Sequence, residues 1–406
     1  MRIFVIMFSY ILGNLLYFIS SFFSRNEDIW IFGSWGGNLY ADNPKYFYDY
    51  VKENHKNIRP IWLSRNRQLV ARLKKKGVEV YHIYSLTGMW FSCRASIGVT
   101  SHGMIDLNRY ACSGLNIVQT WHGIPMKPIL RSDPKIEQRK KRNLLKKMAF
   151  LFPFLKKELN YEKNLIICSS SEYVTKEMLK KCFGNLSPIK EVGFPRIDGL
   201  FDIKKCSLTE RIASLQNKNI KIGLFMPTYR RKGEYDIIGE FLNNRIYIEK
   251  QLIKENSILF LKIHPFDFYK IPKKINSQRI LIVDSREIDD DIYSILRCFD
   301  YLITDFSSII FDYLVLQRPI MLYVPDREDY INKNGAFLYD YLRLGLPVYA
   351  EIKDLFNDFN RFWKDDYLRM IQSITRRIHT SIKKDNCIRL YEEIQRLNHE
   401  GISNAP

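Results

Sequence analysis

Two series of short apolar segments, each alternating with helical patterns, constrain the fold of this chain more than any other feature of its sequence. In the first series the strand-like segments are residues 28–34, 59–63, 78–82, 95–100 and 115–120. Helical patterns over residues 46–53, 68–75 and 86–92 separate the first four of these segments. This order is typical of a parallel sheet with helices on both faces.

A second series begins near Lys221 and predicts a second sheet of the same kind. Its strand-like segments are residues 222–226, 257–263, 279–283, 301–304 and 319–324, with a short helix through Ile292, Ile295 and Leu296. The polar, lysine-rich segment 201–219 separates the two series, and two charged amphipathic helices follow within 367–397.

The predicted fold class is α/β, with two Rossmann-like domains, an N-terminal membrane-associated helix and C-terminal helices. A chain of 406 residues has room for roughly two to three domains. We expect an apolar helix in residues 1–25, a first Rossmann-like domain in 26–200, a second in 201–366 and helices in 367–406.

The charge of the chain predicts a polyanionic neighbour. The formal net charge is +19, which suits nucleic acid, an acidic lipid surface or a substrate that carries phosphate. The seven cysteines include no C-x-x-C pair, so a disulfide scaffold or a zinc ribbon is excluded and a reducing compartment is favoured.

Two segments suit a membrane surface. Residues 3–23 form an apolar run between Arg2 and Arg25, without a cleavage site, and we expect a membrane anchor or an in-plane helix; the alternative is a buried core helix. Segment 135–157 joins a basic stretch to an aromatic, apolar one, which suits an anionic membrane surface. A solvated helix followed by a core helix is the alternative. Nucleic acid is not expected, because no base-reading module is present.

Histidines at the ends of predicted strands are the first candidates for chemistry. His122 and His264 each follow a strand-like segment and precede Gly or Pro, at the edge where parallel sheets collect ligands. His102, in Ser101-His102-Gly103, is a third residue of this kind, with a role left open. A purely structural role is the alternative for each of them.

Phosphate-binding patterns lie in three turns. Segment 304–312 reads as a strand, a turn with Ser307 and Ser308, and a helix whose free N–H groups suit phosphate. Arg196 and Arg230 lie in turns that begin Gly193-Phe194-Pro195 and Pro227-Thr228-Tyr229, and arginine binds phosphate in a bidentate way. A plain helix cap and solvated surface arginines are the alternatives.

These motifs together resemble the CDP-glycerol glycerophosphotransferase family of teichoic acid and capsule synthesis. The resemblance rests on Trp121-His122-Gly123-Ile124-Pro125-Met126-Lys127, Gly193-Phe194-Pro195-Arg196, Pro227-Thr228-Tyr229-Arg230, Lys262-Ile263-His264-Pro265 and segment 304–312, in that order. It covers residues 28–324. It implies a GT-B-like fold whose two Rossmann-like domains face a cleft, with the acceptor on the first domain and a CDP-polyol donor on the second.

The resemblance also implies residue roles. His122 would be the general base, and His264 with Lys262 would bind the donor phosphates. The remaining substrate-binding residues would be Trp121, Gly123, Ile124, Pro125, Arg196, Pro227, Thr228, Ile263, Ser307, Ser308 and Asp312. Such enzymes act at the cytoplasmic face of the cell membrane on an acceptor linked to polyprenyl diphosphate.

The physical requirements of such a transfer agree with these residues. A hydroxyl that attacks phosphorus needs a base with a pKa near 7, which histidine supplies. No carboxylate cluster accompanies the motifs, so we expect neither a metal nor another cofactor. Departures at Ile124, Met126, Ile197 and Arg231 leave glycerol, ribitol or another polyol open. The alternatives are a GT-B glycosyltransferase that uses a nucleotide sugar and a non-catalytic membrane-bound assembly protein.

Overall fold

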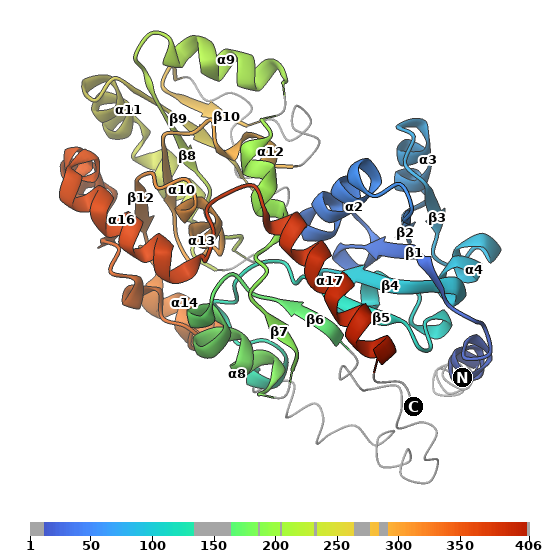
Figure 1. Cartoon of the computed structure of the whole chain (residues 1–406). Helices are drawn as coiled ribbons and strands as arrows, with labels where there is room; N and C mark the ends of the chain where they lie inside the picture. Colours follow the sequence, from blue (N-terminus) through green and yellow to red (C-terminus); the bar gives the residue numbers. More distant parts are fainter. Residues whose placement is uncertain are drawn as a thin grey trace, which may run out of the picture.

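The computed structural model describes residues 12–133, 164–185, 187–203, 205–230, 234–263, 277–283 and 291–403. Within these ranges the chain forms two sheets covered by helices (Figure 1). The first sheet has the strand order β3-β2-β1-β4-β5-β6-β7, and the second has the order β10-β9-β8-β11-β12-β13. The strand pairs of both sheets are parallel, as in β1 with β4 and β8 with β11. Both sheets follow the Rossmann order, which confirms the α/β prediction.

The first sheet and its helices, here called the N-terminal half, begin at Asn26. The strands are β1 (Asn26–Gly33), β2 (Arg59–Ser64), β3 (Val80–His82), β4 (Ala95–Thr100), β5 (Asn116–Gln119), β6 (Asn164–Cys168) and β7 (Ile189–Lys190). The helices are α2 (Asp42–Asn54), α3 (Arg67–Lys75), α4 (Leu86–Arg94), α7 (Glu172–Val174) and α8 (Lys180–Phe183), with short turns η1 (Trp35–Gly37) and η2 (Gly103–Asp106). Asn66 and Ser85 cap α3 and α4, because their side chains accept backbone N–H groups of the first turn.

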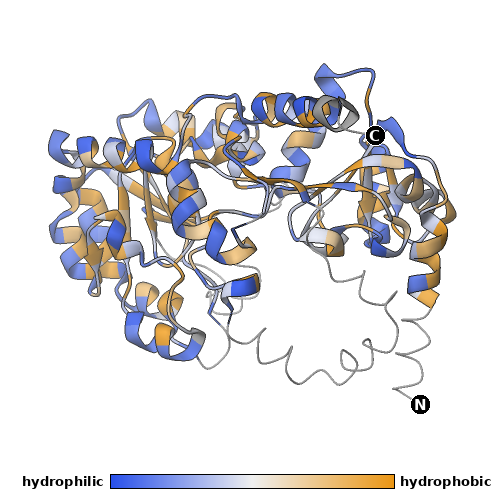
Figure 2. Ribbon diagram, turned by 60° about the horizontal axis from the view of Figure 1, so that its bottom comes forward, coloured by the Kyte–Doolittle hydropathy of each residue, from blue (hydrophilic) through white to orange (hydrophobic). Residues whose placement is uncertain are grey.

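The second sheet and its helices form the C-terminal half. The strands are β8 (Lys221–Phe225), β9 (Ser257–Leu261), β10 (Ile280–Ile282), β11 (Tyr301–Thr304), β12 (Ile320–Tyr323) and β13 (Val348–Tyr349). The helices are α9 (Ser207–Gln216), α10 (Ile237–Asn243), α11 (Arg245–Lys254), α12 (Tyr293–Leu296), α13 (Ile309–Leu314), α14 (Arg327–Asn334), α15 (Ile352–Asn357) and α16 (Asp365–Ile378). Every residue of β9, β11 and β12 is buried, because helices cover both faces of the sheet. Figure 2 shows the apolar residues along the strands and the hydrophilic ones on the outer helices.

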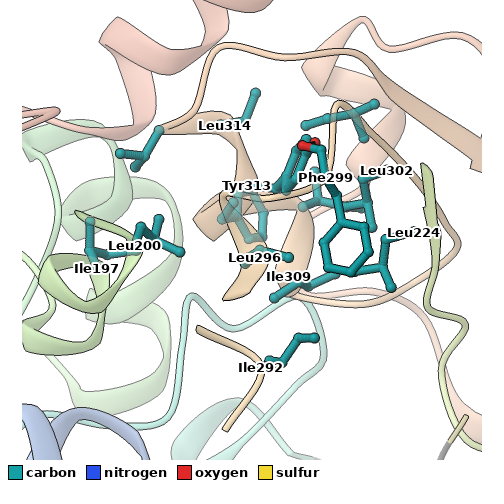
Figure 3. Packing of buried hydrophobic residues seen from close by; sticks show 14 of the residues in the cluster. Ile197, Leu200, Leu224, Ile292, Leu296, Phe299, Leu302, Ile309, Tyr313 and Leu314 are labelled. Carbon is teal, nitrogen blue, oxygen red and sulfur yellow. Dashed lines mark hydrogen bonds between the residues drawn. The ribbon is translucent and has the colours of Figure 1, made fainter. Parts of the chain in front are cut away.

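A short 3₁₀ helix and the last helix connect the halves. The 3₁₀ helix η8 (Pro195–Phe201) packs against α2 of one half and α12 of the other. Its Ile197 and Leu200 lie in the same apolar cluster as Leu296 and Tyr313 (Figure 3). The last helix, α17 (Asn386–Ser403), returns to the N-terminal half and packs on β6 and α2 (Figure 1). The chain therefore crosses between its halves twice.

The two segments expected at a membrane are only partly described. Residues 12–20 are helical, and Leu15, Phe18 and Phe22 are exposed. Among the described residues, the structure contains no helix with the length and hydropathy that crossing a membrane requires. Residues 3–11 and the basic and apolar segment 135–157 lie outside the described ranges.

Candidate active site

Three connecting segments meet at the carboxyl edge of the first sheet. Strands β1 and β4 are neighbours at the point where the strand order reverses, and β5 lies next to β4. The segments that follow these strands carry Trp35, His102 and His122, whose rings pack together. Open parallel sheets bind ligands at this edge, as the sequence predicted for His122.

The backbone holds His122 in one tautomer. Its Nδ1 lies 3.3 Å from the carbonyl oxygen of Ser101. Because a carbonyl only accepts hydrogen bonds, Nδ1 carries the proton and Nε2 keeps its lone pair. Burial lowers the pKa of His122, while Asp42 partly opposes this shift. The imidazole is therefore neutral near pH 7 and can take a proton at Nε2.

Unusual backbone conformations surround His122. Trp35, Asp42 and Trp121 have φ angles of 50°, 63° and 57°, in the left-handed region that favours glycine. Each such residue costs about 1–3 kcal/mol, and strain of this size concentrates at functional sites. The rings of Trp35 and Trp121 lie 6.2 Å and 4.4 Å from that of His122.

Gly123 brings the two halves into contact beside His122. Its φ is 128°, and a Cβ atom there would lie 2.6 Å from Arg196 Nη2 and 3.3 Å from Ser308 Oγ. Ser308 directly precedes α13 of the C-terminal half. The glycine therefore allows a close approach that any side chain would prevent.

Arg196 forms a buried ionic bridge between the halves. Its Nη1 donates to Asp42 Oδ1 at 2.9 Å, and its Nη2 donates to Asp312 Oδ2 at 2.7 Å. Nη1 also donates to the carbonyl oxygen of His122 at 2.8 Å. The hydroxyl of Tyr293 donates to Asp312 at 2.8 Å. Arg196 and Asp312 were both expected beside the donor, and the structure places them against each other.

The corresponding edge of the second sheet joins two of the predicted motifs. Thr228, after β8, donates from its backbone N and its Oγ1 to Asp305, after β11, at 2.8 Å and 2.7 Å. Arg230 is buried and pairs with Asp305 and Asp326, each at 2.8 Å. The side chains of Ser307 and Ser308 are half-buried at the start of α13. Of these turns, the one with Ser308 approaches Gly123.

The other predicted site residues that the structure describes lie in three places. Trp121, Ile124 and Pro125 are buried in the loop after β5, and Ile124 belongs to the main apolar core. Pro227 is half-buried in the turn after β8. Lys262 follows β9 and donates its backbone N–H to Phe225, and Ile263 is buried. His264 lies outside the described residues.

Sequence reasoning missed the residues that support His122. Asp42 was given no role in the site, yet it pairs with Arg196. Asp106 was not singled out, yet it accepts the backbone N–H groups of Gly36, Ser101 and His102. The Ser101-His102-Gly103 turn was the available signal, because it follows a strand at the same edge as His122.

Several curated proteins of teichoic acid synthesis are similar to this chain. A teichoic acid poly(glycerol phosphate) polymerase of Bacillus spizizenii is 28% identical over 81% of this chain and 82% of the relative. The chain spans only 40% of the Bacillus subtilis polymerase of the same name, with 27% identity over 77% of this chain. A teichoic acid poly(ribitol-phosphate) polymerase of Bacillus spizizenii is 33% identical over 47% of this chain and 30% of the relative.

The fold and the family are established by two further findings. A structure of the wall teichoic acid polymerase TagF superposes with a TM-score of 0.71 and 19% identity, covering 98% of this chain and 96% of that one. The family model described as CDP-Glycerol:Poly(glycerophosphate) glycerophosphotransferase matches residues 15–395. The chain therefore belongs to this family, as the motifs indicated, and is a glycerophosphotransferase-like enzyme.

Proposed function

We propose that this enzyme transfers glycerol phosphate, or a related polyol phosphate, from a CDP-polyol to a hydroxyl of a lipid-linked acceptor and releases CMP. The observation that carries the proposal is the contact between His122 Nδ1 and the Ser101 carbonyl. This contact places the ring proton on Nδ1 and leaves Nε2 unprotonated, so that it can act as a base. The family description supports CDP-glycerol as the donor. The ribitol-phosphate relative supports testing ribitol as well.

In the proposed reaction, the oxygen of the acceptor hydroxyl bonds to the phosphorus that carries the polyol. At the same time His122 Nε2 takes the proton of that hydroxyl. The bond from that phosphorus to the bridging oxygen breaks, and CMP leaves with the electron pair. Phosphoryl transfer of this kind depends on positioning and on positive charge near the phosphates. We assign the donor phosphates to Lys262, His264 and the turn with Ser307 and Ser308, in the half opposite His122.

The function is tested by measuring CMP release without added metal from CDP-glycerol and CDP-ribitol, with membranes as the source of acceptor. We expect release from one donor, unaffected by EDTA. His122→Asn keeps a side-chain N–H for the Ser101 carbonyl but removes the base, so its rate should fall ~10²–10⁴-fold.

His82→Asn is the matched control, because His82 is a half-buried histidine on β3 whose Nε2 contacts the Arg65 carbonyl. It should react at the wild-type rate. Full activity in His122→Asn, or no CMP from either donor, would contradict the proposal.

We also propose that the enzyme attaches to the cytoplasmic face of the cell membrane as a peripheral protein. Phe18 and Phe22 are 60% and 73% exposed on a chain with a net charge of +19, a combination that favours anionic lipid. Phe18→Ser with Phe22→Ser should weaken sedimentation with phosphatidylglycerol vesicles. Ile253→Ser, on an exposed position of α11, should not. Equal binding by both variants would count against this surface.

A further inference from the structure

His102 has no part in the reaction proposed above, yet its ring lies directly against His122. The two imidazoles are parallel to within 7°, and their centroids are 4.0 Å apart. Trp35 packs on the same pair, with its ring 4.9 Å from that of His102. Both histidines are half-buried, so this pair of rings is accessible from solvent.

Ser101 orients both imidazoles. Its Oγ donates to Asp106 Oδ2 at 3.2 Å and lies 2.8 Å from His102 Nδ1. We assign the hydroxyl proton to the carboxylate, so that His102 Nδ1–H donates to Oγ. The carbonyl of the same serine accepts from His122 Nδ1–H. Both rings therefore turn Nδ1 toward Ser101, and both turn Nε2 toward the opposite side.

The loop that carries His102 is built around a buried carboxylate. Asp106 is fully buried and accepts backbone N–H groups of Gly36 at 2.6 Å, Ser101 at 2.7 Å and His102 at 2.6 Å. These bonds fix the backbone of His102 and, through Ser101, its ring. Burial and the neighbouring His122 both lower the pKa of His102, so its ring is neutral near pH 7. With the proton on Nδ1, its Nε2 is an acceptor.

We propose that His102 and His122 form a two-imidazole subsite for a pair of neighbouring hydroxyls on the acceptor. His122 takes the proton of the attacking hydroxyl, and His102 Nε2 accepts a hydrogen bond from the hydroxyl on the adjacent carbon. A polyol phosphate end or a sugar ring presents such a diol. The inference rests on the proposed function for the attacking hydroxyl, and it adds the acceptor class and a residue that selects it.

The test compares two acceptors that differ by one hydroxyl. An alkyl-linked glycerol phosphate ends in two neighbouring hydroxyls, and the alkyl-linked 3-hydroxypropyl phosphate lacks the inner one. A site built to bind a hydroxyl rejects the analogue without it, so the wild type should favour the diol ~10–100-fold in kcat/KM. His102→Phe keeps a flat ring against His122 and removes the acceptor nitrogen.

In His102→Phe, kcat/KM should fall for the diol acceptor only, so the preference for the diol is lost. The KM for the CDP-polyol donor should stay unchanged. His55→Phe is the matched control, since His55 also stacks on a ring, that of Tyr391 at 3.5 Å, and it should behave as the wild type. An equal loss with both acceptors in His102→Phe, or an intact preference, would overturn the proposal.

A second measurement does not depend on turnover. In ¹⁵N NMR spectra, the Nε2 signal of His102, assigned by its absence in His102→Phe, should shift on titration with the glycerol phosphate probe and not with its analogue. A shift without CMP release would retain the subsite and reject the proposed reaction. No shift with the diol would overturn the subsite whatever the reaction is.

Discussion

At the scale of single residues, backbone geometry sets the chemistry of the candidate site. The Ser101 carbonyl selects the tautomer of His122. The left-handed conformations of Trp35, Asp42 and Trp121 place their side chains around that histidine, at the energetic cost of sparsely populated φ angles. The surrounding fold maintains these three backbone conformations. Neutral His122 is therefore held in place by a backbone carbonyl, without a carboxylate hydrogen-bonded to its Nδ1.

The pH dependence of the reaction should reflect the burial of His122. The base must be neutral, and burial lowers the pKa of His122 from its usual 6.5. Activity should therefore persist below pH 6.5 and disappear only as the pH falls through this lowered pKa. The measurement is kcat/KM for CMP release against pH. An acid limb at or above pH 6.5 would contradict the prediction.

Gly123→Ala should separate backbone strain from close contact. A methyl group at Gly123 would lie 2.6 Å from Arg196 Nη2, whereas one at Gly77 would meet nothing within 4 Å, and both glycines have positive φ. Both alanine variants should lose about 1–2 kcal/mol of stability from the left-handed strain. Only Gly123→Ala should also lose CMP release, measured alongside chemical denaturation. Equal activity in the two variants would show that the contact is dispensable.

At the scale of elements, the sequence predicted the long or fully buried segments best. Strands β4 and β11 have the predicted bounds. In β11 the apolar run Tyr301-Leu302-Ile303 is the pattern of a buried parallel strand. Strands β6, β7 and β13 were missed. Strands β7 and β13 have two residues each, which is too few to show a periodicity. Helix α9 formed inside the segment expected to be a boundary, where Leu208 and Ile212 are buried on one face.

Helix α16 is joined to α13 by a histidine that should make stability depend on pH. His379 ends α16 and donates from Nε2 to the Phe311 carbonyl at 2.7 Å, and burial lowers its pKa to about 4. The unfolded chain binds the proton near pH 6.5, so this group reduces folding stability as the pH falls from 6.5 toward 4, by up to about 3 kcal/mol.

Urea denaturation at pH 7 and pH 5 tests this linkage. His379→Gln keeps a side-chain N–H for Phe311 but cannot take a proton. The wild type should lose more stability between the two pH values than the variant does. Parallel losses in both proteins would contradict the assignment.

At the scale of the whole molecule, the candidate site depends on how the two halves meet. Gly123 approaches Ser308, and Arg196 links Asp42 to Asp312 across the halves. The sequence placed all of these residues except Asp42 in motifs but could not pair them, because their partners are set by docking between sheets more than a hundred residues apart. The backbone N–H of Cys387 in α17 donates a hydrogen bond to Asp198 in η8. The last helix therefore also stabilises the contact between the two halves.

Removing the buried bridge should destabilise the whole molecule. Arg196→Met leaves two buried carboxylates unpaired, which should cost about 3–5 kcal/mol. Arg59→Met is the control, because Arg59 pairs with Glu79 at the surface, where such a pair contributes about 0–1 kcal/mol. Chemical denaturation measures both. A loss for Arg196→Met no larger than that of the control would show that the bridge does not hold the halves together.

A hydroxyl activated by His122 attacks phosphorus in the proposed reaction. Identifying which bond of CDP-glycerol breaks tests this most directly. Purified enzyme would be incubated with CDP-glycerol and the glycerol phosphate probe and followed by ³¹P NMR. The account predicts that the diphosphate signals give way to one phosphodiester and CMP, in the wild type and not in His122→Asn. Release of CDP instead of CMP, or the same products from His122→Asn, would contradict it.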